Sequence, residues 1–259
     1  MRGLMGGFYK ISEWIMRLSV INLLWVICSV PFIFVVIGFL QGFAAAPDTS
    51  GLVVGYLLIG IVGSLTFFPA TGAMFTVARK WVTGDEDVPL FKTFFRGYKE
   101  NYKQSFLGGL VYTLISVVFY VNFVFYQGQN GSFQLVGYLF IALSAFLFAS
   151  MFHFFSVMVH FHMKFLQVLK NALLITIGRP VTTVLLLVVN LFVLYISFFR
   201  FTFLIPFFMG SIIAYMSFFQ FHRIFTKSQL KLEQEALAAE EAAEEERKAS
   251  EAVETKENS

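Results

Sequence analysis

The sequence has little charge, and almost no negative charge in its apolar part. Only 14% of the 259 residues are charged, whereas 58% are hydrophobic and 35 are phenylalanine. A soluble domain has about 25% charged residues, so a lone soluble globule is excluded. No Asp or Glu occurs between Asn101 and Leu232. Because proton-coupled carriers usually place carboxylates inside their spans, independent active transport is not expected.

Motifs for energy coupling and catalysis are also missing. No Gly-Lys pair occurs, so the chain has no Walker A loop to hold a nucleotide phosphate. It contains neither a nucleophile elbow nor an HExxH motif. The single cysteine, Cys28, cannot form an intramolecular disulfide. We therefore expect no catalytic residues, no cofactor and no enzyme activity.

The four histidines are the remaining candidates for a metal site. Metal ligands on one helix usually lie three or four residues apart. His153 and His160 are seven residues apart, about 10 Å along a helix, and His162 faces away from His160. We expect no metal site, and we rank an intramembrane enzyme or metal sensor that uses these residues and His222 last.

Long apolar runs predict an all-α, polytopic membrane protein, because a spanning helix needs about 20 mainly apolar residues. The six predicted spans are Ser19–Leu40, Gly51–Val77, Ser105–Tyr126, Leu135–Val159, Val181–Phe199 and Phe201–Phe221. The last two would measure about 60 Å as one helix, so a turn is predicted at Phe199–Phe201. The turn places Arg200 at the far interface.

The distribution of Lys and Arg predicts the orientation. Placing the N-terminus in the cytosol puts 15 of these residues inside and Arg200 alone outside, for the chain up to Leu232. We therefore expect a multi-pass protein of the bacterial cytoplasmic membrane with both termini cytoplasmic. Residues 19–227 would form the membrane domain, including a basic cytosolic loop at 78–104. Residues 228–259 would form an acidic cytosolic tail.

Short amphipathic helices are predicted on the inner membrane surface, at residues 1–18, Pro89–Lys103 and Lys164–Ile177. In the second of these, aromatic residues form one stripe and basic residues form another. The basic stripe consists of Lys92, Arg96, Lys99 and Lys103. Basic residues near the surface attract anionic lipid, worth about 1 kcal/mol each. We expect this stripe to contact anionic inner-leaflet lipids and, as an added hypothesis, to dock a partner.

Several residues within the spans are candidates for packing or for a site. Pro31 and Pro69 are expected to kink their helices, because proline removes an intrahelical hydrogen bond. Such kinks build sites in some transporters, and they also serve plain packing. Asn22, Asn122 and Asn190 are expected to hydrogen-bond a neighbouring helix, with substrate binding as the alternative. Arg200 is a further candidate as the one charge in the last apolar block.

Three stretches of the sequence resemble the YesL-like family of uncharacterised bacterial integral membrane proteins. These are GLMGGFYKISEWIMRLSVINLLW at 3–25, FFPATGAMFTVARKWVTGDEDVPLFKTFFRGYKENYKQS at 67–105, and LQVLKNALLITIGRP at 166–180. The central stretch is the most specific. The acidic tail is not part of the family pattern.

The resemblance implies a role rather than a chemistry. Members of the family typically occur in Gram-positive bacteria beside genes for polysaccharide breakdown and for sugar uptake by ABC transporters. It implies a non-catalytic accessory or assembly subunit for ABC-type carbohydrate uptake, with importer subunits as partners and no nucleic acid. The alternative is a facilitative small-solute permease that acts alone through the spans kinked at Pro31 and Pro69.

Overall fold

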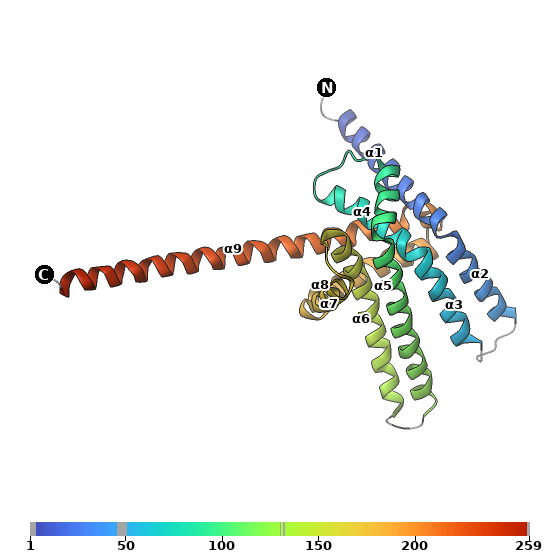
Figure 1. Ribbon diagram of the computed structural model, residues 1–259. Coiled ribbons are helices and arrows are strands. Elements are labelled where there is room, and N and C mark those ends of the chain that lie inside the picture. The colour runs from blue at the N-terminus through green and yellow to red at the C-terminus, as the bar shows by residue number, and fades with distance from the viewer. Residues whose placement is uncertain (1–3, 46–50, 130, 132, 258–259) are drawn as a thin grey trace. The chain divides into compact units, whose positions relative to one another are not determined.

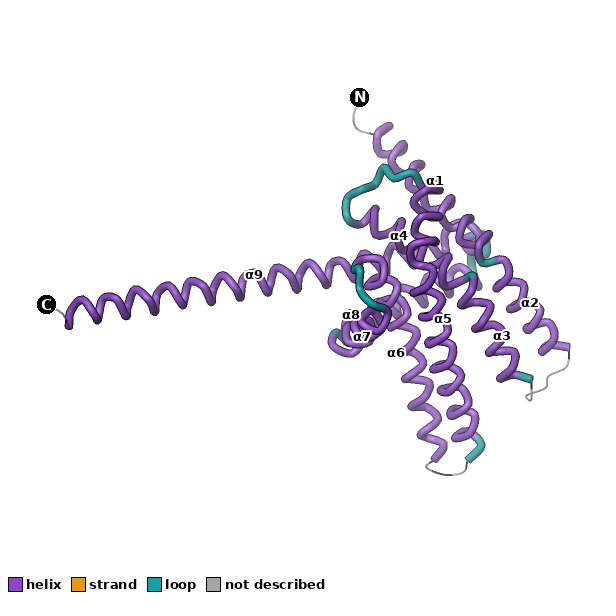
Figure 2. The backbone as a smooth tube through the Cα atoms, in the orientation of Figure 1, coloured by secondary structure: helices purple, strands orange, loops and turns teal. Residues whose placement is uncertain are grey.

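The fold of the chain is entirely helical in the computed structural model, which describes residues 4–45, 51–129, 131 and 133–257. No strand occurs among these residues, and Figure 2 shows helices joined by short loops. The elements are α1 (Leu4–Cys28), α2 (Val30–Ala45), α3 (Leu52–Leu65), α4 (Phe67–Val82), α5 (Leu90–Gln127), α6 (Phe133–His160), α7 (Phe165–Gly178), α8 (Pro180–Phe199), the π-helix η1 (Ile205–Met209) and α9 (Gly210–Glu257). The prediction of an all-α protein is confirmed.

The chain divides into two units, Met1–Phe219 and Gln220–Ser259. Within the first unit, α5 and α6 form a long antiparallel hairpin, and α2 and α3 form a second, shorter one (Figure 1). The second unit is a continuation of helix α9 and carries the predicted acidic tail.

Four described helices are long and apolar enough to cross a membrane, namely Gly7–Cys28, α5, α6 and α8. The pair α3 and α4, bent by 41° at Thr66, passes the same test when the two helices are taken together, and counting it as one span gives five candidate spans. Six spans were predicted from the sequence. The sixth, Phe201–Phe221, does not form one apolar helix, because a turn and the π-helix precede α9. The turn itself is confirmed, since α8 ends at Phe199 and Arg200 caps it.

Two predicted surface helices are not separate from the spans that follow them. The N-terminal helix expected at 1–18, of which residues 1–3 lie outside the described residues, continues from Leu4 without a break to Cys28. The helix expected at Pro89–Lys103 continues as α5 for 38 residues, about 57 Å, with Pro89 as its N-cap. No proline interrupts either segment, so nothing stops the helix at the membrane surface. The third, Lys164–Ile177, is confirmed as α7 with Lys164 as its N-cap.

Both predicted proline kinks coincide with helix breaks. Ser29 separates α1 from α2 two residues before Pro31, and Thr66 separates α3 from α4 three residues before Pro69. Proline at position 69 cannot donate to the carbonyl of Leu65, which therefore lacks its helical partner. The hydroxyl of Tyr102 in α5 donates to that carbonyl at 3.2 Å. A side chain from the next spanning helix thus replaces the lost backbone hydrogen bond.

Helix α5 packs closely on its neighbours because small residues line the contacts. A Cβ added at Gly60 of α3 would lie 2.0 Å from Thr113, and one at Gly109 would lie 2.6 Å from Ser64. Neither contact admits a larger side chain without movement of the helices. Aromatic rings fill the core where α4, α5 and α6 meet. The central rings are Phe68, Phe75, Tyr112, Phe154 and Phe155.

Candidate functional site

The four predicted docking residues lie together on the exposed surface of α5. Lys92, Arg96, Lys99 and Lys103 are all exposed and follow one another at three- and four-residue steps. We call these four residues the basic face. Arg96 is paired with Glu100 at 2.8 Å, and both side chains are more than half exposed. No ion pair of the other three residues is found within the described part of the chain.

The helix that carries the basic face is held in place by polar contacts. The amide of Asn101 donates to the hydroxyl of Thr76 in α4 at 3.1 Å. The amide of Gln104 donates to the carbonyl of Met163, in the loop between α6 and α7, at 2.8 Å. On the opposite side of this helix, Phe94 is completely buried. The segment is therefore a packed extension of a span, and not the loosely floating surface helix that the stripe pattern predicted.

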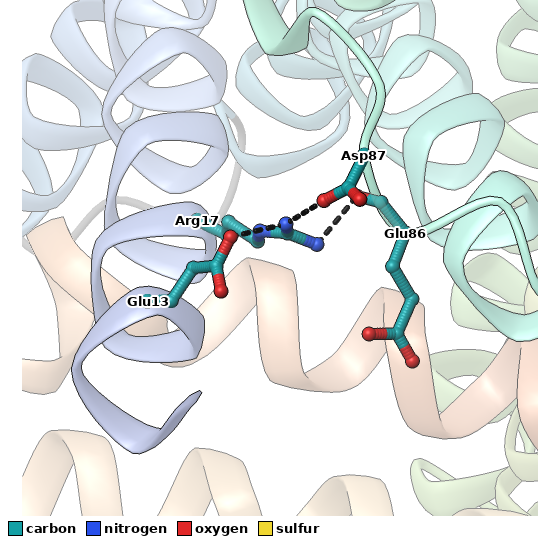
Figure 3. Close-up of polar contacts among 4 residues, drawn as sticks. All are labelled: Glu13, Arg17, Glu86 and Asp87. Atoms are coloured by element: carbon teal, nitrogen blue, oxygen red, sulfur yellow. Dashed lines mark hydrogen bonds and ion pairs between the residues drawn. The ribbon is translucent and has the colours of Figure 1, made fainter. Parts of the chain in front are cut away.

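A buried arginine lies at the same end of the bundle, where α1 meets the loop between α4 and α5. Arg17 is 7% exposed and forms ion pairs with Glu13 of its own helix and with Asp87, at 2.5 Å (Figure 3). Its guanidinium also donates to the carbonyl of Glu86. The guanidinium carbon lies 5.9 Å from the ring centre of Trp14, a cation–π distance. The first helix is thereby attached to the loop that leads into the basic face.

The amphipathic pattern that predicted a helix at 1–18 did not reveal this contact. Arg17 is buried, while the apolar side chains of Phe8 and Ile11 are 69% and 59% exposed. An apolar outer face is what a lipid environment favours. The acidic Asp85–Asp87 segment, between the basic residues of α4 and α5, is the sequence feature that could have indicated a partner for Arg17.

A second polar contact lies at the π-helix and confirms the hydrogen bond to a neighbouring helix that was predicted for Asn22. Asn22 of α1 is fully buried, and its amide nitrogen donates to the carbonyl of Ile205 at 2.9 Å. Its amide oxygen accepts from the backbone nitrogen of Ser211 at 3.0 Å. A Cβ at Gly210 would lie 3.1 Å from that oxygen, so the glycine permits the close approach. Asn22 thus joins α1 to the π-helix at Ile205 and to the first turn of α9 at Ser211.

The predicted intramembrane candidates do not form one site. Asn190 donates to the hydroxyl of Ser217 at 2.9 Å, the interhelical bond that was predicted. Asn122 donates instead to the carbonyl of Val118, four residues earlier in its own helix. Arg200 is exposed at the end of α8. The hydrogen bonds of Asn190 and Asn122 thus go to different residues, and neither bond joins two of the predicted candidates.

The histidines were the remaining candidates for a metal site. No group of three or more His, Cys, Asp or Glu side chains that could hold a metal ion occurs among the residues described. His153 is buried in α6 at 1% exposure.

A cavity of about 540 Å³ lies beside α5, between α3 and α6. Aromatic and aliphatic side chains line most of it, together with a few hydroxyl groups. The lining residues include Phe32, Tyr56, Gly60, Phe68, Tyr112, Thr113, Ser116, Tyr120, Phe140, Ile141, Ser144, Phe148 and Met151. We call this cavity the aromatic groove. None of the predicted site residues lines it. Its walls are mainly aromatic and aliphatic side chains, which are common in all the spanning helices and form no distinctive sequence pattern.

These long apolar helices, packed through small residues and rings, define a helical integral membrane protein. A family model described as "Protein of unknown function, DUF624" matches residues 18–123. The uncharacterised protein YteU of Bacillus subtilis (strain 168) is 31% identical over 218 residues, covering 82% of each chain. The uncharacterised protein YesL of the same organism is 30% identical over 208 residues, covering 80% of this chain and 84% of its own. The chain belongs to the YesL-like family.

A third relative, the uncharacterised protein YesV of Bacillus subtilis (strain 168), is 30% identical over 145 residues. That match covers 54% of this chain and 69% of YesV. No solved structure matches the chain. The comparisons therefore give the family and no activity.

Proposed function

We propose that this protein is a non-catalytic accessory or assembly subunit of the bacterial cytoplasmic membrane that acts through a partner. The observation that carries the proposal is the basic face, a row of four exposed cations on α5. This part of α5 is hydrogen-bonded to α4 through Asn101 and to the loop between α6 and α7 through Gln104. A rigid charged surface suits recognition, because little conformational entropy is lost when a partner binds. Anionic inner-leaflet lipids contact the same residues.

The orientation in this proposal places the basic face in the cytosol. Helix α8 spans 20 residues, about 30 Å, which equals the thickness of the hydrocarbon core. Arg179 precedes this helix and Arg200 follows it, so the two arginines fit opposite interfaces. With Arg200 outside, the other basic segments lie inside, as the distribution of Lys and Arg favours. Both termini are placed in the cytosol in this proposal, which requires η1 and the apolar start of α9 to return the chain across the membrane as a broken sixth span.

The partner in this proposal is a subunit of an ABC-type carbohydrate importer, as the resemblance to the YesL-like family implies. The experiment compares two triple variants of the full chain, produced in the native membrane. K92E/K99E/K103E reverses three charges of the basic face. K10E/K164E/K170E reverses three other exposed lysines and serves as the matched control. Proteins that co-purify after mild crosslinking are identified by mass spectrometry.

We expect importer subunits to co-purify with the original chain and with the control, and to be lost with K92E/K99E/K103E at equal membrane abundance. Equal recovery with both variants would refute docking through the basic face. Reduced abundance of K92E/K99E/K103E alone would mean that these lysines serve only to seat the protein in the membrane. Absence of importer subunits from every preparation would refute the choice of partner.

The facilitative permease is the competing proposal, and it predicts solute flux in liposomes that contain this chain alone. Asn122 and Asn190 would then affect flux. The amide nitrogens of both side chains already donate, to Val118 and to Ser217, and neither residue lines the aromatic groove. The structure thus gives this proposal less support than the basic face gives to docking.

A further inference from the structure

The aromatic groove opens on the outer surface of the spanning helices. Tyr56, Ile141 and Ser144 form part of its rim and are exposed. Its floor is buried, since Phe68 is 8% exposed and Tyr112 is 5% exposed. Helices α3 and α6 both pack on α5, which lies between them in Figure 1. Because all three helices belong to the spanning part of the chain, the rim faces lipid rather than water.

The groove is elongated along the helices. From Tyr112 to Tyr120 it follows α5 for about 12 Å, at 1.5 Å per residue. From Phe140 to Met151 it follows α6 for about 16 Å. Its volume of about 540 Å³ lies within the range of ligand cavities. An elongated space of this size, parallel to the bilayer normal, fits an extended hydrocarbon chain better than a compact, ring-shaped molecule.

The chemistry of the walls selects an apolar occupant. No charged or amide side chain lines the groove. Three of the six hydroxyl groups in its lining already have partners. Tyr112 is hydrogen-bonded to Ser150 at 2.6 Å, Ser116 donates to the carbonyl of Thr113, and Ser144 donates to the carbonyl of Phe140. A sugar would bring many hydroxyl groups without enough partners, which disfavours its binding.

We propose that the aromatic groove binds one acyl chain of a membrane phospholipid, which enters sideways between α3 and α6. The rings of Tyr56 and Tyr120 are stacked with centres 6.0 Å apart, near the ends of their helices. Tyrosine favours the membrane interface because its ring is apolar and its hydroxyl is polar. The two hydroxyls lie where the ester and headgroup region of the lipid begins. This proposal does not depend on the docking of a partner.

The experiment uses the full chain in vesicles of phosphatidylethanolamine and phosphatidylglycerol. The probe is a phosphatidylglycerol with a photoreactive diazirine near the end of one acyl chain. Labelled positions are mapped by mass spectrometry. We expect label on the buried floor at Phe68 and Tyr112, which lipid around the protein cannot reach. The exposed Val184 and Val188 of α8 report contact with surrounding lipid.

Two variants fill the groove, Ser144→Phe and Ser116→Leu, and Leu139→Phe is the control on an exposed position of α6 outside it. We expect both filling variants to lose label on the floor and to keep it on α8, and the control to keep both. The proposal is overturned if the floor is never labelled, or if both filling variants leave its labelling unchanged. Displacement of the floor label by excess glucose would also overturn it, in favour of a solute site.

Discussion

Replacing Arg17 by methionine should destabilise the protein measurably, because it removes a buried cation that joins α1 to the loop between α4 and α5. Three interactions are lost, to Glu13, Asp87 and the carbonyl of Glu86. Breaking a buried ion pair costs about 3–5 kcal/mol. The side chain of Asp87 is 93% exposed and is solvated again by water, and that of Glu13 is 30% exposed. We therefore expect a loss of about 2–3 kcal/mol.

Arg96→Met is the matched control for this prediction. Arg17 and Arg96 each pair with a glutamate four residues away on the same helix, but the Arg96 side chain is 72% exposed. Exposed pairs contribute little to stability, so Arg96→Met should be close to neutral. The measurement is the free energy of unfolding of the full chain in mixed micelles. If Arg17→Met costs no more than Arg96→Met, burial of the guanidinium is not what makes the contact stabilising.

Three further substitutions test the packing of the spanning helices. Asn22→Ala should cost about 2–3 kcal/mol in unfolding free energy, since it removes two buried hydrogen bonds, one to the carbonyl of Ile205 and one from the backbone nitrogen of Ser211; Asn122→Ala, which affects only a bond within one helix, should cost less. Gly60→Val should lower the melting temperature through overlap with α5, and Gly38→Val, with open space around it, should not. Tyr102→Phe should cost about 1 kcal/mol by removing the partner of the carbonyl freed in α3, and an unchanged unfolding midpoint would contradict this.

Local features of the fold followed from the sequence alone. The turn after Phe199, the helix at Phe165–Gly178 and the breaks near Pro31 and Pro69 were all predicted. Each depends on neighbouring residues only, through apolar length, caps or the missing amide of proline. The exposed basic face on α5 also followed, because a three- and four-residue repeat fixes which side chains share a helix surface.

Other features depend on contacts between distant residues, which no local pattern encodes. The sequence did not show that α5 would run unbroken from its basic segment into the membrane, because a surface helix and a spanning helix have the same backbone. The site of Arg17 was missed because its partner Asp87 lies 70 residues away.

The sequence by itself determined that this chain is an all-α membrane protein with a basic body and an acidic tail. Composition and apolar length are enough for this, because the bilayer core cannot satisfy unpaired backbone groups and so selects helices. Only the tertiary structure decided which polar groups meet and where a cavity remains. Asn22 acquired its role from the π-helix at Ile205–Met209, and the aromatic groove arose from the spacing of α3 and α6 around α5. The physical reason is that packing is set by the shapes of all helices together, whereas helix formation is set by each segment alone.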